Sequence, residues 1–217
     1  MRIAEEYFNI RWPVVFGIIT ALYLTIMLLS QSLVNEIVYY NSFSEQLTYD
    51  RAEELYGILR KRFWLTYPLF PLILLVKITS VGLVIYAGVL ISGFQKQIPL
   101  GRVIRVATAS EVVFVLAAAV KVLWFCFFAG NYTLTDISFF YPASLINLFS
   151  TEEVDSFWIF PLQTMNLFHL IYILLLIYGL KVTGGLSGAN SERIVAGTYL
   201  PVLIVWIAFI MFLNVKN

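Results

Sequence analysis

One stretch of sequence decides the fold. Residues 64–94 read WLTYPLFPLILLVKITSVGLVIYAGVLISGF, and Lys77 is the only charged side chain in them. A helix needs about 20 consecutive apolar residues to cross the hydrocarbon core of a bilayer. Pro68 and Pro71 lie near the beginning of the stretch, where a proline disturbs a helix least. The stretch therefore predicts a transmembrane helix with residues to spare for tilt.

Four further apolar stretches accompany it, at residues 13–34, 103–130, 158–182 and 194–213. Of the 217 residues, 60% are hydrophobic and 12% are charged, and the mean hydropathy is +0.86. Soluble domains carry about 25% charged residues, so composition excludes that class. We expect an all-α, polytopic integral membrane bundle of five transmembrane helices that forms a single domain over residues 1–217.

The connection after the first stretch carries an amphipathic pattern. Apolar residues recur there at helical spacing, at Ala52, Leu55, Leu59 and Phe63, and charged residues fill the other faces. This pattern predicts a short helix over residues 49–63 that lies on the membrane surface.

Composition also excludes several functions. The formal net charge of +1 excludes a basic nucleic-acid-binding protein. Cys126 and His169 are the only residues of their types, so we expect no metal site and no cofactor. Ser187 lies in a Gly-Leu-Ser-Gly sequence similar to that of rhomboid proteases, but no histidine follows it to act as a base. We therefore predict that the protein is not an enzyme.

Basic residues near the helix ends predict the orientation. With the N-terminus in the cytoplasm, the inner side holds Arg2, Arg11, Lys96, Arg102, Arg105, Lys181 and Arg193. The outer side holds Arg51, Arg60, Lys61, Arg62 and Lys216. Residues 131–157 contain no lysine or arginine, which favours an outer loop. We predict a multi-pass protein of the plasma (inner) membrane, with its C-terminus on the side opposite the cytoplasm.

Three ionisable residues fall inside the apolar stretches: Lys77, Glu111 and Lys121. Such groups are costly in the hydrocarbon, so each is a candidate functional residue. One interpretation is a proton or ion relay. The other is a structural ion pair between Lys77 and Glu111, which a snorkelling lysine can form across antiparallel helices, with Lys121 reaching outward.

The fourth stretch carries polar residues at steps of three, at Gln163, Asn166, His169 and Tyr172. On one continuous helix, this spacing keeps them on one slowly drifting face. They would either line a ligand groove, with His169 as a proton acceptor, or hydrogen-bond between helices. Together with Lys77, Glu111 and Lys121, they form the predicted substrate or partner face.

The C-terminal half resembles the Yip1 family of five-helix membrane proteins. The resemblance covers residues 140–213: the sequence FYPASLINLF at 140–149, the turn GLKVTGGLS at 179–187, and a final apolar helix that contains Pro201. It implies a cytosolic N-terminus and a non-enzymatic membrane component. The Asp-Leu-Tyr-Gly-Pro motif of eukaryotic members is absent, so their trafficking role is not carried over.

Two functions follow from these patterns. The first is a non-enzymatic accessory or assembly partner in a larger membrane complex, surrounded by membrane lipids and other membrane proteins. The alternative is a small transporter or channel subunit that uses the intramembrane residues Lys77, Glu111, Lys121 and His169.

Overall fold

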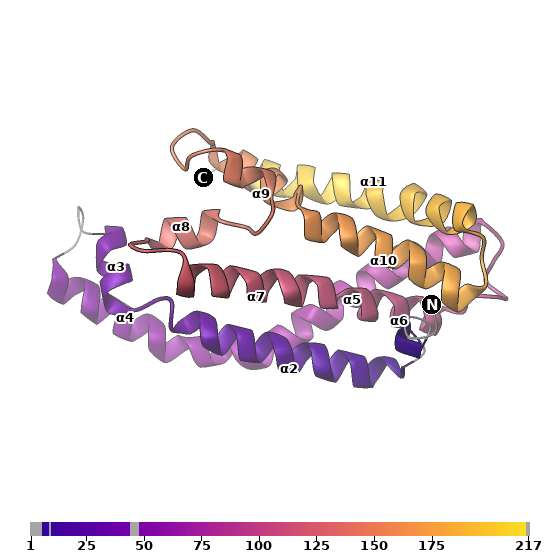
Figure 1. Cartoon of the computed structure of the whole chain (residues 1–217), viewed down its shortest axis with the longest axis horizontal. Coiled ribbons are helices and arrows are strands. Elements are labelled where there is room, and N and C mark those ends of the chain that lie inside the picture. Colours follow the sequence, from indigo (N-terminus) through magenta and orange to yellow (C-terminus); the bar gives the residue numbers. More distant parts are fainter. Residues whose placement is uncertain (1–5, 9, 44–47, 216–217) are drawn as a thin grey trace.

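The computed structural model describes residues 6–8, 10–43 and 48–215, and every named element in these ranges is a helix (Figure 1). Arg2 and Lys216, which enter the orientation argument, lie outside the described residues. The α-helices are α2 (Trp12–Gln31), α3 (Glu36–Phe43), α4 (Tyr49–Arg62), α5 (Thr66–Ile91), α6 (Leu100–Ser110), α7 (Val112–Phe127), α8 (Leu134–Phe139), α9 (Ser156–Thr164), α10 (Leu167–Gly184) and α11 (Gly188–Asn214). Two short 3-10 helices are η1 (Phe63–Leu65) and η2 (Leu145–Leu148).

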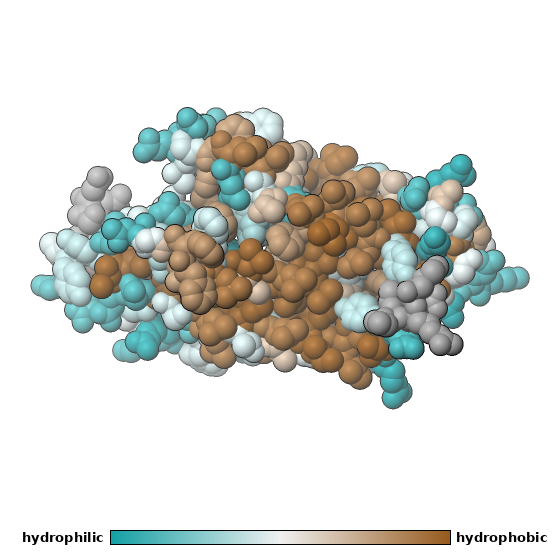
Figure 2. Space-filling view, viewed as in Figure 1, coloured by the Kyte–Doolittle hydropathy of each residue, from teal (hydrophilic) through white to brown (hydrophobic). Residues whose placement is uncertain are grey.

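Five helical runs are long and apolar enough to cross a membrane, as the sequence predicts. They are Trp12–Gln31, Tyr49–Ile91, Leu100–Phe127, Leu167–Gly184 and Gly188–Asn214. They lie along the long axis of the molecule (Figure 1). Figure 2 shows a broad hydrophobic surface over the middle of the molecule, with hydrophilic residues at both ends. This distribution is consistent with helices that are apolar enough to cross a membrane.

Small residues allow the helices to approach closely, as is common between membrane helices. Gly88 of α5 faces Thr198 of α11, and a Cβ at position 88 would lie 2.7 Å from a methyl carbon of that threonine. A Cβ at Gly179 of α10 would lie 2.5 Å from Val106 of α6. The core of the bundle is therefore formed where α5, α6, α10 and α11 meet, and α2 packs against α6 and α7.

The predicted surface helix differs from the structure in how it joins the next element. It is present as α4, but it continues through η1 into α5, so that residues 49–91 form one helical run of 43 residues. Figure 1 shows α4 extending along the length of the molecule rather than across it. Pro68 and Pro71 lie inside this run, and the helix continues past both of them.

The predicted helix over residues 158–182 is two helices. α9 ends at Thr164, and α10 begins at Leu167 after a non-helical Met165. The side chain of Asn166 accepts a hydrogen bond from the backbone N–H of His169 at 2.7 Å and so caps α10. The N–H of Leu167 donates to the carbonyl of Ala143, and that backbone pairing holds the break against a distant loop.

The glycine-rich turn between α10 and α11 has the conformation that its residues predict. Gly185 has a φ of +63°, the left-handed conformation that commonly ends a helix. Ser187 then caps α11, because its hydroxyl accepts a hydrogen bond from the N–H of Asn190 at 3.2 Å. α11 begins six residues before the predicted position of 194, since the polar first turn, Gly188 to Arg193, is helical as well.

Candidate functional site

The third of the five long apolar helical runs is interrupted at Glu111. α6 ends at Ser110, and α7 begins at Val112. At the break, the N–H of Glu111 donates to Thr108 and that of Phe114 donates to Glu111, which are tighter, three-residue steps. The hydroxyls of Thr108 and Ser110 donate to the carbonyls four residues before them, a pattern that bends helices. All three polar side chains are buried, so the break places a carboxylate in the interior.

Lys77 of α5 forms an ion pair with this carboxylate. Its Nζ donates to Glu111 Oε1, which matches the pair expected from the sequence. The two partners differ in burial, because the side chain of Glu111 is 0% exposed and that of Lys77 is 45% exposed. Glu111 Oε2 is buried and has no hydrogen-bond partner in the described part of the chain. The Lys77 Nζ also lies 4.1 Å from the ring centroid of Phe114, within cation–π range.

Aromatic residues of α10 and α11 extend the cluster from Phe114. The Phe114 ring lies 5.6 Å from that of His169 and 4.8 Å from that of Tyr172, between centroids. His169 Nε2 lies 2.9 Å from the hydroxyl of Tyr199, a hydrogen bond whose direction depends on the histidine tautomer. The Tyr172 hydroxyl is buried without a partner among the described residues. Side chains of α5, α7, α10 and α11, with Glu111 at the α6–α7 break, therefore meet in one polar cluster.

Non-helical backbone lies beside this cluster. The N–H of Leu145 donates to the carbonyl of Met165, and the N–H of Leu167 donates to that of Ala143, each at 3.0 Å. Burial, and then the nearby Glu111 carboxylate, raise the pKa of Tyr141 in this loop. The loop that follows α8 therefore approaches the start of α10 and the carboxylate from the same side. Irregular backbone at such depth is tolerated in membrane proteins where protein covers it or where it lines a cavity.

The structure brings some of the predicted site residues together and separates others. Lys77, Glu111, His169 and Tyr172 belong to the polar cluster. Lys121 lies elsewhere, in the wall of a pocket of about 360 Å³ between α2, α5 and α7.

The predicted polar stripe on one helix is wrong for two of its members, because the helix is broken between them and the rest. Gln163 of α9 donates to the carbonyls of Ser138 and Phe139, at 2.7 and 2.8 Å. Asn166 caps α10. Both hold local structure around the break.

Sequence reasoning missed Phe114 and Tyr199. Neither is distinguishable from the other aromatic residues of the apolar stretches, because their roles come from contacts between helices far apart in sequence. In the described part of the chain, no group of three His, Cys, Asp or Glu side chains is placed to hold a metal ion. The cluster offers instead a charge pair at membrane depth and a histidine–tyrosine hydrogen bond.

Comparisons with protein-family models, with curated proteins and with solved structures found no match for this chain. A buried carboxylate at a helix break can hold a proton or a small cationic group, and a partly exposed lysine side chain can meet a partner at the surface.

Proposed function

We propose that this chain is a multi-pass integral membrane protein that acts, without catalytic chemistry of its own, as an assembly partner in a larger membrane complex. The observation that supports this function is the exposure of Lys77. It is the twelfth of the 26 residues of α5, which places it about 17 Å from the start of that helix. Its depth is therefore close to the middle of a hydrocarbon core of about 30 Å.

A lysine side chain that is 45% exposed at that depth is unfavourable in lipid. Insertion scales assign a cost of about 2.5–3.5 kcal/mol to a lysine at the centre of a membrane helix. The ion pair with Glu111 offsets only part of this cost, because 45% of the lysine side chain remains uncovered. Ile73 and Val76 share the same face of α5 and are also exposed. A partner helix on this face would cover the exposed part of the lysine side chain and bury apolar surface.

Site-specific photo-crosslinking in native membranes tests this proposal. A benzophenone amino acid replaces Val76, which is 66% exposed, and in a control variant it replaces Val205 of α11, which is 68% exposed. We expect one discrete protein adduct from position 76 and none of the same mass from position 205. Mass spectrometry of the chain co-purified in mild detergent should then identify the same partner. Lipid adducts alone at both positions would contradict the proposal.

We place the protein in the plasma (inner) membrane with a cytoplasmic N-terminus and the C-terminus on the opposite side. The excess of basic residues near the α5–α6 and α10–α11 turns supports this orientation, as does the absence of lysine and arginine from residues 131–157. The resemblance of residues 140–213 to the Yip1 family stays a prediction, and it implies the same orientation and a non-enzymatic role.

A second candidate is a transporter or channel subunit. The observation that favours it is that buried polar atoms without hydrogen-bond partners among the described residues lie close to interrupted helices. The run Leu100–Phe127 is interrupted at Glu111, and α9 is separated from α10 at Met165 and Asn166; broken helices line substrate and ion sites in transporters. Glu111 Oε2 and the Tyr172 hydroxyl, both buried, are available there for a proton or a small ligand.

Flux measurements separate this candidate from the first. Proton and cation uptake is measured in vesicles reconstituted with the wild-type chain, with Glu111→Gln and with Lys121→Met. A transporter that uses the cluster should lose most of its flux in Glu111→Gln and keep it in Lys121→Met, because Lys121 lies outside the cluster. Flux that does not exceed that of protein-free vesicles would rule the candidate out for the ions tested.

A further inference from the structure

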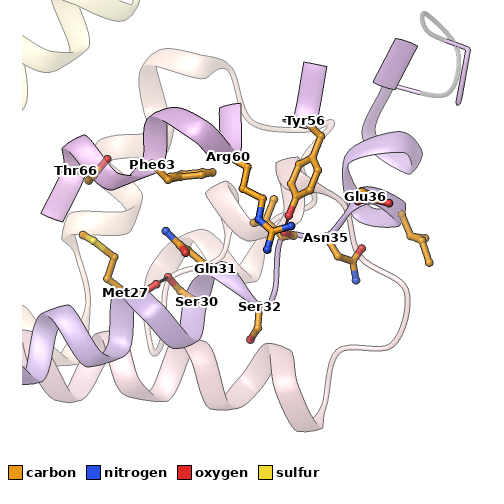
Figure 3. A pocket seen from close by; sticks show the side chains of 12 residues that line it. Met27, Ser30, Gln31, Ser32, Asn35, Glu36, Tyr56, Arg60, Phe63 and Thr66 are labelled. Carbon is orange, nitrogen blue, oxygen red and sulfur yellow. Dashed lines mark hydrogen bonds between the residues drawn. The ribbon is translucent and has the colours of Figure 1, made fainter. Parts of the chain in front are cut away.

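A pocket of about 630 Å³ lies where α2 ends and α4 passes into α5. This volume falls within the range of about 300–1,000 Å³ that is typical of sites for small molecules. Its walls come from the last turn of α2, the start of α3 and the junction of α4 with α5 (Figure 3). The junction marks a change along one helical run, from charged residues in α4 to apolar residues in α5. Lipid headgroups lie at such boundaries.

The pocket has one positive and one negative side chain. Arg60 belongs to the last turn of α4, and Glu36 to the first turn of α3. The structure records no ion pair for either residue within the described ranges. Figure 3 shows the Arg60 side chain extending from α4 into the pocket, with its guanidinium drawn between Gln31 and Asn35. The uncharged polar side chains of Gln31 and Thr66 also line the pocket.

A mainly apolar pocket, with Lys121 as its one charged wall residue, adjoins this one. It has a volume of about 360 Å³ and shares Met27, Ser30 and Val34 with the first as common walls. Its other walls include Phe70 of α5 and Val122 of α7, so it lies between helices that are long enough to span a membrane. A charged chamber at the helix ends thus leads into an apolar chamber between the helices, which is the shape of an amphiphile.

We propose that the two pockets bind one phospholipid whose headgroup carries both a phosphate and a primary ammonium. The Arg60 guanidinium binds the phosphate, for which its planar donors are suited. The Glu36 carboxylate accepts hydrogen bonds from the ammonium, and an acyl chain enters the apolar pocket. Glu36 disfavours a headgroup with net negative charge and a free phosphate, because it adds a like charge to the same chamber. This inference goes beyond the proposed function and needs only that the bundle be inserted in a membrane.

Native mass spectrometry of the full chain in detergent, titrated with defined lipids, tests the site. The probes are phosphatidylethanolamine, phosphatidylcholine and phosphatidylglycerol with the same acyl chains, and inorganic phosphate. We expect phosphatidylethanolamine to bind about tenfold tighter than the other two lipids. The other two lack the charge-assisted hydrogen bond to Glu36, and the loss of about one such bond corresponds to a factor of about ten in affinity. Choline cannot donate a hydrogen bond to Glu36, and glycerol leaves the Glu36 carboxylate without a positively charged partner. Inorganic phosphate should not bind at the same concentrations.

Three variants test the roles of the Arg60 and Glu36 charges in lipid binding. Arg60→Gln should weaken the binding of all three phospholipids by about tenfold. Glu36→Gln should abolish the preference for phosphatidylethanolamine over phosphatidylglycerol. Lys61→Gln is the matched control: it removes the neighbouring positive charge of α4 outside the pocket, and it should bind like the wild type.

A change in the common wall tests the acyl chain. Ser30 is shared by both pockets, and Ser30→Trp should weaken the binding of the diacyl lipid but not that of the soluble headgroup glycerophosphoethanolamine. Equal binding of all three lipids by the wild type would indicate non-specific lipid contact and overturn the proposal. Tight binding of inorganic phosphate would indicate an anion site instead. Should a variant fail to fold, judged by gel filtration, the lipid series on the wild type still decides.

Discussion

Replacing Lys77 by methionine should destabilise the protein more than replacing Glu111 by glutamine. Lys77→Met leaves a fully buried carboxylate without its partner, and one of its oxygens already lacks a hydrogen bond within the described chain. Removing one partner of a buried pair costs about 3–5 kcal/mol, and the half-exposed lysine places this case at the lower end, about 3 kcal/mol. In Glu111→Gln, the amide oxygen still accepts from the ammonium, and the lysine can snorkel, so we expect about 1 kcal/mol.

The double variant should recover part of the loss. With the carboxylate and the ammonium both removed, no unpaired charge is left, and we expect a total cost of about 2 kcal/mol rather than the sum of the single changes. The coupling free energy between the two residues is then about 2 kcal/mol, within the range measured for residues in contact.

Equilibrium unfolding in mixed micelles, followed by tryptophan fluorescence, measures all four free energies of unfolding. Lys121→Met serves as a control, because it removes an intramembrane ammonium that lies outside the ion pair. Additive losses would show that the two residues do not stabilise each other. A larger loss in Glu111→Gln than in Lys77→Met would refute the argument from burial.

Three further predictions follow from local contacts. Asn166→Ala removes the cap of α10 and should lower the free energy of unfolding by about 1 kcal/mol, measured by the same titration. Gly179→Ala should destabilise by about 1–3 kcal/mol, since its Cβ meets Val106, whereas Gly197→Ala, with open space around it, should be neutral or stabilising. For the orientation, an impermeant thiol reagent added outside should label Ser138→Cys and not Lys96→Cys in a background without the native cysteine. The reverse pattern would overturn the cytoplasmic N-terminus.

The membrane-spanning runs could be predicted because their signal is local. Apolar stretches around Trp12–Gln31 and Gly188–Asn214 are long and nearly free of charge, and length and hydropathy suffice to recognise them. The Lys77–Glu111 pair could be predicted as well. Two antiparallel helices joined by a short turn bring residues at similar depth together, and the length of a lysine side chain covers the remaining difference.

The interruptions could not be predicted, because they depend on distant contacts. The break before α10 is held by hydrogen bonds from residues 143–145 to residues 165–167, which no periodicity reveals. One local signal was available: an asparagine three residues before the backbone N–H that it caps. The assumption of one continuous helix turned that cap into part of a polar stripe. Tyr199 was missed for a related reason, since it joins the cluster only through tertiary packing with His169.

The two proposed functions depend on different members of the ion pair. Assembly uses the partly exposed Lys77, and transport uses the fully buried Glu111. An assembly partner needs the exposed end, where 45% of the Lys77 side chain is uncovered on the face of α5. A transporter needs the enclosed end, where Glu111 Oε2 stands beside a helix break. Glu111→Gln keeps a positive side chain on the face of α5, so it should preserve the crosslink from position 76 even if it abolishes flux. If the crosslink is lost in Lys77→Met but kept in Glu111→Gln, the result would support the function as an assembly partner, with Lys77 as the residue that contacts the partner.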